Sequence, residues 1–315
     1  MAYLLRYRLL ILPLALGCGS CIDQISTDLP TPPKVLVMNS IITPDSVFRA
    51  QVSRVASPVD SASRLLSSAR VYLVAPGRST ELLRNQGRGL YASMNKPVSG
   101  VAYTLRAEAT DYPLASATDT VPAGVPIREG WYSYPTGTDQ NQEYVGTLVV
   151  RFDDPAPTAN FYELIAYQVP TRSPRQTQDF YLDARGNAAL AAEGDAEFEP
   201  ETLVFSDKLF NGQAFELRAS FMPYAITVAG TVGGVPVPPK LSGEVYVVLR
   251  SVSRAYYQYR KSWTRHFYNQ GTKGLGGSLN QLLFLGDPIR MYSNVGMGYG
   301  VVVSYAKDTK VLPFR

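Results

Sequence analysis

The chain has little of what metal sites and catalytic dyads are usually built from. Its 315 residues include two cysteines, Cys18 and Cys21, and a single histidine, His266. A C-x-x-C pair binds zinc only with two further ligands, and no other cysteine follows in the sequence. The scarcity of thiols and imidazoles therefore argues against a zinc site and against a dyad built on cysteine or histidine.

Charged residues are also few, and neither sign dominates. Lys, Arg, Asp and Glu make up 18% of the chain, with a formal net charge of +4. That charge falls to +2 if Arg6 and Arg8 are removed with a signal peptide. Proteins that bind nucleic acids carry dense basic surfaces, and no basic run is present here. We expect no nucleic-acid partner.

No apolar run is long enough to span a bilayer, and the longest one lies at the N-terminus. Arg6 and Arg8 precede the apolar stretch Leu9–Leu16, and small residues follow it, as in a secretory signal. A lipoprotein signal also needs a cysteine directly after a small residue, and Gly17-Cys18 and Ser20-Cys21 both provide one. We predict a signal peptide over residues 1–20 and a lipid on Cys21, with Cys18 as the alternative. An ordinary cleaved signal and a cytosolic C-x-x-C pair are the competing interpretations.

The rest of the chain reads as a tether followed by two β-rich domains. The segment 21–34 is polar and proline-rich, as expected of an extended tether. Short alternating segments separated by turns then predict an antiparallel sandwich of the immunoglobulin or carboxypeptidase-regulatory type over residues 35–126. A second β-rich domain is expected over residues 127–315. The fold class we predict is therefore mainly β.

Individual strands are predicted where apolar and polar residues alternate between turn signals. The predicted strands are Val35–Ile42, Phe48–Val55, Ala69–Val74, Leu90–Met94, Tyr103–Ala109, Tyr144–Phe152, Phe161–Val169, Leu217–Phe221, Gly243–Val252 and Val301–Tyr305.

One segment, about 253–269, has helical spacing instead. It places Tyr256, Tyr259, Trp263 and Phe267 on one helical face, after Ser253 as a possible N-cap. Such a face could bind a partner, but an aromatic stripe is more often packed on a sheet, and that is our prediction.

Two acidic runs could ligate calcium, because hard cations prefer clustered carboxylates. They are Asp153-Asp154 and the group Asp195, Glu197 and Glu199. Neither has the ligand spacing of a calcium loop, so a turn and a solvated acidic loop are the favoured interpretations. The sequence leaves open whether the acidic loop binds calcium, and we predict no metal site and no cofactor.

The remaining motif-like segments do not match the context that their chemistry needs. His266 has no acid or nucleophile near it in sequence, which favours a structural or surface role. The segment Gly271–Ser278 lacks the order of residues in a phosphate-binding loop, and Gly296–Gly300 precedes a strand where a dinucleotide fingerprint would follow one. We expect a protein that is not an enzyme. A hydrolase would require a pocket that brings Asp153, Asp154 or Asp207 together with a high-pKa acid.

Several short motifs occur in order along nearly the whole mature chain. They are Cys21-Ile22-Asp23, Asp28-Leu29-Pro30, Val35–Asp45, Ala69-Arg70-Val71, Gly89-Leu90-Tyr91, Ala102–Leu105, Phe152-Asp153-Asp154, Ser206-Asp207, Phe210-Asn211-Gly212, Ser251-Val252-Ser253, Tyr256-Tyr257 and Ser293–Gly300. Together these motifs resemble a family of Bacteroidota-type surface lipoproteins with a domain of unknown function. The loop Pro170–Glu201 departs from the pattern.

The resemblance implies a location and a partner but no site residues. Members of that family look like companions of TonB-dependent outer-membrane receptors. We therefore expect an outer-membrane protein, anchored by its lipid on the cell surface or on the periplasmic face. Its expected role is that of a non-enzymatic binding or accessory subunit of a nutrient-uptake system. The alternative is a structural or adhesive surface protein, and ligand, partner identity and stoichiometry stay open.

Overall fold

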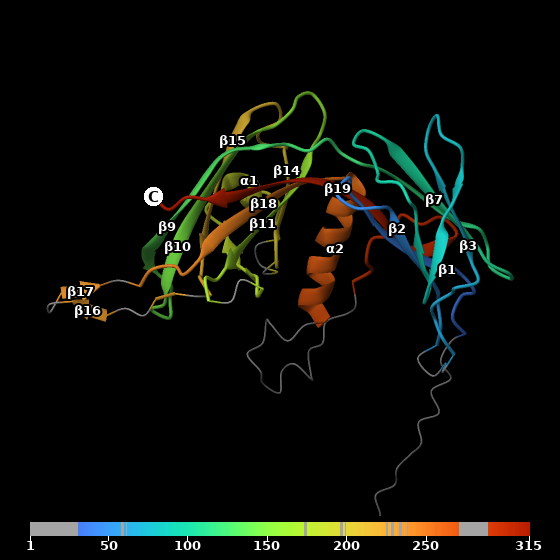
Figure 1. Ribbon diagram of the computed structural model, residues 1–315, viewed down its shortest axis with the longest axis horizontal. Coiled ribbons are helices and arrows are strands. Elements are labelled where there is room, and N and C mark those ends of the chain that lie inside the picture. Colours follow the sequence, from blue (N-terminus) through green and yellow to red (C-terminus); the bar gives the residue numbers. More distant parts are fainter. Residues whose placement is uncertain are drawn as a thin grey trace, which may run out of the picture.

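The computed structural model describes residues 31–57, 60, 62–172, 175–195, 198, 200–224, 226–227, 230–232, 235–237, 239–270 and 289–315. Cys18, Cys21, the signal peptide and most of the predicted tether lie outside these ranges. The described chain is mainly β, as predicted, and forms two sandwich-like units on either side of one long helix (Figure 1).

The first unit, here called the N-terminal sandwich, packs two sheets around one core. One sheet contains β1 (Leu36–Ile42), β2 (Arg49–Arg54), β6 (Leu90–Ala92) and β5 (Arg84–Gly87). The other contains β4 (Glu81–Leu82), β3 (Arg70–Val74), β7 (Ala102–Glu108) and β8 (Ala115–Thr120). Alternation explains the packing: Leu36, Met38 and Ile42 of β1 are buried while Ile41 is exposed.

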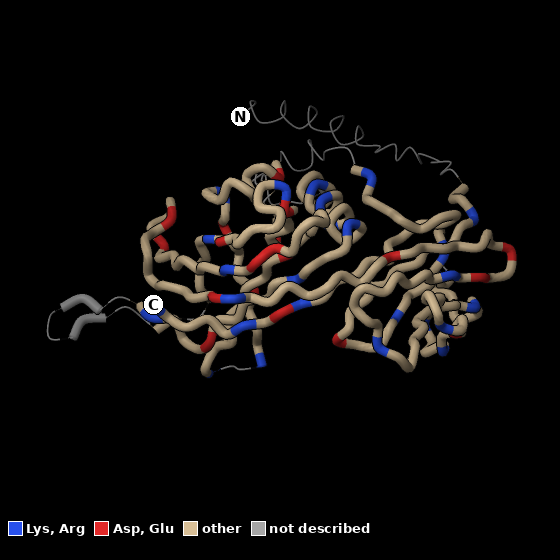
Figure 2. Tube along the Cα trace, turned by 90° about the horizontal axis from the view of Figure 1, so that it is seen from above, with Lys and Arg blue, Asp and Glu red and all other residues tan. Residues whose placement is uncertain are grey.

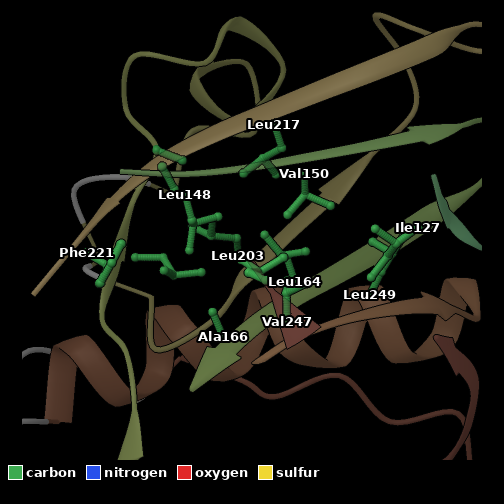
Figure 3. Close-up of a cluster of buried hydrophobic side chains, with 14 of the residues drawn as sticks. Ile127, Leu148, Val150, Leu164, Ala166, Leu203, Leu217, Phe221, Val247 and Leu249 are labelled. Atoms are coloured by element: carbon green, nitrogen blue, oxygen red, sulfur yellow. The ribbon is translucent and has the colours of Figure 1, made fainter. Parts of the chain in front are cut away.

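The second unit, the C-terminal sandwich, is built in the same way from longer strands. One sheet has the order β13 (Leu182–Asp183), β15 (Ala214–Phe221), β10 (Tyr144–Asp153) and β9 (Ile127–Thr138). It faces β12 (Gln178–Asp179), β11 (Phe161–Val169), β18 (Glu244–Val252) and β14 (Leu203–Ser206), the last of which pairs with β11. Figure 3 shows Leu148 and Val150 of β10 and Leu217 of β15 directed toward Leu164 of β11 and Val247 of β18 in this core.

A single strand, β19 (Gly298–Leu312), belongs to both units. Its first half pairs in parallel with β1, from Leu36↔Gly298 to Ile42↔Ser304. Its second half pairs antiparallel with β18, from Val252↔Tyr305 to Val245↔Leu312. The two sandwiches therefore share one nine-stranded sheet, and the predicted strand Val301–Tyr305 is only the middle of this longer strand.

The predicted boundary between the two domains, between residues 126 and 127, can be compared with the two cores that share β19. Val295 and Val302 lie in the core of the N-terminal sandwich, although they were assigned to the second domain. Val125, in the predicted exit from the first domain, is buried in the core of the C-terminal sandwich, and its N–H donates to Ser251 Oγ at 3.0 Å. A boundary drawn along the sequence does not describe how the two cores are filled.

The predicted helix is α2 (Arg254–Gln270), and its start is capped as the sequence indicated. Ser253 Oγ accepts from the N–H of Tyr256 at 3.1 Å. Tyr256 is buried against Val301 and Val303 of β19, whereas Phe267, three turns later, is 37% exposed. The predicted packing on the sheet is therefore confirmed for the first turns of α2.

The remaining elements are short. They are α1 (Ala188–Ala191), whose N-cap is Asn187, and the hairpin of β16 (Gly230–Val232) and β17 (Val235–Val237). Within the described ranges, no helix combines the length and the apolar content that crossing a membrane requires.

Candidate functional site

Charged side chains gather where α2 meets the sheet, around the buried carboxylate of Glu163 on β11. Glu163 is 1% exposed, and its Oε2 accepts from Arg250 Nη1 at 2.6 Å and from the Tyr256 hydroxyl at 2.7 Å. Its Oε1 accepts from Thr202 Oγ1 at 2.7 Å and lies 3.3 Å from Arg260 Nε. These five residues, the Glu163 cluster, tie β11, β18, α2 and the segment before β14 together.

The ionisation of the Glu163 cluster supports a structural role. Burial opposes the charge on Arg250, but Glu163 beside it outweighs burial and holds the pKa of Arg250 above its ordinary value. Burial and the adjacent carboxylate raise the pKa of Tyr256 above its ordinary value, so its hydroxyl stays a donor. Because all of these donors contact the Glu163 carboxylate, its role is to hold β18, α2 and the segment before β14 against β11.

A second carboxylate, Glu193, lies after α1 and faces the next turns of α2. Its Oε1 accepts from the N–H and Oγ of Ser206 at 2.8 and 2.7 Å. Its Oε2 accepts from the Tyr257 hydroxyl at 2.5 Å and pairs with Lys261 Nζ at 2.8 Å. Lys261 also pairs with Asp195.

These hydrogen bonds determine the ionisation of Glu193. Burial alone would raise its pKa, but donation from Lys261, Tyr257 and Ser206 outweighs burial and holds the pKa of Glu193 below its ordinary value. Glu193 is therefore an ionised acceptor near neutral pH, and it is poorly suited to donate a proton to a substrate.

Beside this pair is an open cleft of about 640 Å³, here called the α2 cleft. One wall is the face of α2 with Tyr257 and Lys261, and the other is the segment 289–293. The two walls are joined because Ser262 Oγ accepts from the Tyr292 N–H at 2.9 Å and His266 Nδ1 lies 2.9 Å from the Ile289 carbonyl. His266 thus has a structural contact, in line with its sequence interpretation.

The α2 cleft offers binding chemistry. Lys261, Arg265 and Arg290 bring positive charge to its walls, and Glu193 brings a carboxylate. Polar groups of both signs in a concave surface suit recognition of a polar partner or ligand.

The two acidic runs weighed as candidate calcium ligands do not come together among the described residues. Asp153 forms an exposed ion pair with Arg128, at 2.8 Å, and Asp195 is paired with Lys261 and Arg265. Glu197 and Glu199 lie outside the described residues. Within the described part of the chain, no group of three or more His, Cys, Asp or Glu side chains could hold a metal ion.

Asp154 and Asp207 are buried and brace neighbouring loops. Asp154 accepts from the Tyr162 hydroxyl and, at 2.8 Å, from the Gly212 N–H. Asp207 Oδ2 accepts from the Asn160 N–H at 2.7 Å. Burial raises the pKa of Asp207, and the charge of Asp154 adds to the rise. Both carboxylates therefore hold backbone turns in place.

Exposed aromatic and apolar side chains cluster at one end of the C-terminal sandwich. Strand pairing brings them together, because Phe221 of β15 lies opposite both Leu182 of β13 and Gly146 of β10. The neighbours of these paired residues, exposed by 40–65%, form what we call the tip cluster: Tyr144, Tyr181, Met222 and Tyr224. In Figure 1 the hairpin that joins β9 to β10 and the described N-terminal end of the chain both point to the lower side of the molecule.

Two residues of the Glu163 cluster, Glu163 and Arg250, could have been recognised as a pair from the sequence. Glu163 is the single charge in FYELIAYQV, and Arg250 is the single charge in VYVVLRSV, which follows Glu244. A charge on the buried face of a strand needs a partner, so the two could have been paired with each other. Glu193 and Lys261 gave no such signal, because they lie in a polar loop and on a helix with several charges.

Of the two glycine-rich segments considered in the sequence, Gly296–Gly300 has a structural explanation. Gly296 forms a bridge with Ser116, and Gly298 and Gly300 open β19 against β1. Gly271–Ser278 lies outside the described residues.

A protein-family model described as "Domain of unknown function (DUF4249)" matches residues 22–311. The match covers both sandwiches, α2 and nearly all of β19. No curated protein matches the chain.

Proposed function

The chain belongs to the DUF4249 family, a domain of unknown function, and from this premise we propose that it is a lipid-anchored outer-membrane protein. Its role is that of a non-enzymatic binding or accessory subunit beside a TonB-dependent receptor in nutrient uptake. The body faces the cell exterior in this proposal, with the periplasmic face as the alternative orientation.

The N-terminal sequence supports the anchor. An apolar stretch, small residues and Cys21 are followed within 15 positions by the first residue of β1, Leu36. A fully extended chain of that length reaches about 50 Å, which keeps the N-terminal sandwich close to the membrane surface. Acyl chains on Cys21 would provide the anchoring, at about 0.8 kcal/mol per buried methylene.

The single observation that carries the partner proposal is the position of the tip cluster. Tyr144 is the first residue of β10 and directly follows the hairpin from β9, and in Figure 1 that hairpin and the described N-terminal end point to the same side of the molecule. A partner embedded in the same membrane would meet this side first. Tyrosine provides large contact area with few rotatable bonds, which is why it is common at interface hot spots.

Charge on the body is consistent with a protein contact. Figure 2 shows Lys and Arg interspersed with Asp and Glu along both sandwiches, without a broad face of one sign. Mixed surfaces of this kind suit contact with another protein, in which a few aromatic anchors supply most of the affinity.

A pull-down from solubilised outer membranes tests the proposal. The tagged lipoprotein should retain a TonB-dependent receptor, and the double variant Tyr224→Ala, Met222→Ser should lose it. Leu209→Ser is the matched control, since Leu209 is 58% exposed and lies outside the tip cluster. Absence of any receptor with the wild-type protein would contradict the proposal.

An adhesive or structural role is the second candidate, because the same tip cluster could contact another cell or the matrix. A deletion strain separates the two. Lost nutrient uptake with normal attachment supports the accessory role, whereas lost attachment with normal uptake supports adhesion.

A further inference from the structure

We propose that a cavity at one end of the N-terminal sandwich, here called the mouth cavity, is a binding site for a saccharide. It has a volume of about 540 Å³, within the range of small-molecule sites. Its walls include Arg78, Ser79, Thr80, Glu81, Asn95 and Lys96 over a floor of apolar side chains. The inference deepens the proposed function and rests on it only for the biological use of the ligand.

The mouth cavity lies at the end of the sandwich away from the tether. β1 runs from Leu36, beside the tether, to Ile42, and β2 returns from Arg49 at the far end. Phe48, just before β2, holds the loop after β6 in place: its N–H donates to the Asn95 carbonyl at 3.3 Å and its carbonyl accepts from Ser93 at 3.0 Å. The opening therefore faces away from the predicted lipid anchor.

The floor is rigid and partly aromatic. Phe48 and Tyr103 are 1% and 3% exposed, with ring centroids 6.4 Å apart. The Tyr103 hydroxyl accepts from the Val98 N–H at 2.9 Å, which fixes the rim to the floor. These packed side chains form a fixed base and leave little apolar surface to a ligand, so recognition falls to the polar walls.

The walls carry polar groups that the protein does not use itself. The Arg78, Ser79, Thr80 and Asn95 side chains make no hydrogen bond to any part of the chain that the structure describes. Glu81 accepts from Ser93 Oγ at 2.9 Å and from the Met94 N–H at 3.4 Å, and its remaining lone pairs stay available. Donors and acceptors are thus both present within one concavity.

This combination selects a class of ligand. Two cations, Arg78 and Lys96, and one carboxylate, Glu81, line the cavity, and Lys96 Nζ already donates to the Asp45 carbonyl at 3.1 Å. The lining is therefore neither a dense phosphate site nor a group of carboxylates suited to a metal. An apolar ligand would leave these polar walls without partners at a cost in affinity. A saccharide carries many hydroxyl groups, each of which can donate and accept, and therefore matches the donors and acceptors of these walls.

Saturation-transfer NMR on the full lipoprotein in a non-glycosidic detergent tests the inference. The probes are glucose, galactose, N-acetylglucosamine and cellotriose at millimolar concentration, with glycine and inorganic phosphate as comparison ligands. At least one saccharide should receive saturation, and glycine and phosphate should not.

Two substitutions locate the site. Thr80→Trp fills the cavity without removing a hydrogen bond and should weaken saccharide binding by about tenfold or more. Thr110→Trp is the matched control, because Thr110 is also exposed but lies in the hairpin at the tether end, and this variant should bind as the wild type does. Asn95→Ala truncates a wall residue and should also weaken saccharide binding. It serves as the test if the Thr80→Trp variant does not fold.

The outcomes separate this inference from the proposed function. Absence of saccharide binding, or binding that Thr80→Trp and Asn95→Ala leave unchanged, overturns the inference even where a receptor co-purifies. Binding of glycine or phosphate in preference to every saccharide tested overturns the assignment of the cavity to a saccharide. Saccharide binding without a co-purifying receptor supports the inference while contradicting the proposed function.

Discussion

The guanidinium of Arg250 and the carboxylate of Glu163 meet at 2.6 Å across the pairing of β11 and β18, in a place where the carboxylate is 1% exposed. Arg260 approaches the same carboxylate from α2, at 3.3 Å. One buried negative charge therefore pairs with two partly buried cations. Loss of that charge should cost far more than loss of an exposed ion pair.

Replacing Glu163 by Gln should lower the free energy of unfolding by about 3–5 kcal/mol, because two partly buried arginines would lose the fully buried carboxylate that pairs with them. Urea denaturation followed by tryptophan fluorescence measures this. Glu129→Gln is the control, since the Glu129–Arg151 pair is exposed and should contribute about 1 kcal/mol or less. Equal losses of unfolding free energy in the two variants would contradict the structural role of the Glu163 cluster.

Stability should depend on pH through Glu193. Its pKa in the folded protein is below its ordinary value of 4.5, so its ionised form contributes stability above that value. The contribution is lost as the pH falls through the lowered pKa. The difference in urea midpoint between wild type and Glu193→Gln should therefore be largest at neutral pH and should shrink in acid. A difference that stays constant from neutral pH into acid would show that Glu193 is not the group responsible.

Gly300→Ala should destabilise the protein by about 1–3 kcal/mol or more. Gly300 has φ +106°, and a Cβ there would collide with the Met38 carbonyl on β1. Gly137→Ala is the control, because Gly137 has no atom near its Cβ position and no positive φ. Thermal unfolding should separate the two variants, and similar midpoints would argue against the pairing of β1 with β19.

Cys21→Ser should release the protein from the membrane fraction and leave a form without acyl chains. Cys18→Ser should be retained and should show the mass of an acylated chain that begins at Cys21. Intact-mass analysis of both variants decides between the two cysteines. The reverse result would move the lipid to Cys18.

Local elements could be predicted from the sequence where alternation was regular. Phe161–Val169 was predicted with the bounds that β11 has, and Ser253 with its role as a cap. β9 was not predicted, because Gly130 and Pro135 interrupt its pattern. Gly130 is explained only by the fold, since a Cβ there would lie 2.6 Å from the Leu312 side chain.

Long-range relationships could not be predicted in the same way. The pairing of β1 with β19 joins Asn39 and Val301, which are 262 residues apart. No local pattern records such a partner. The mouth cavity could not be predicted for the same reason, because residues 78–81 and the loop after β6, which together form its walls, are separated in the sequence.

The sharing of β19 has a consequence for how the protein is made. Synthesis proceeds from the N-terminus, so β1 is made long before the strand that covers its edge. Until then β1 presents unpaired N–H and C=O groups that could recruit the wrong strand, within the chain or from a neighbour. The N-terminal sandwich can be completed only after β19 has been made, so its closure is a late step in the folding of the whole chain.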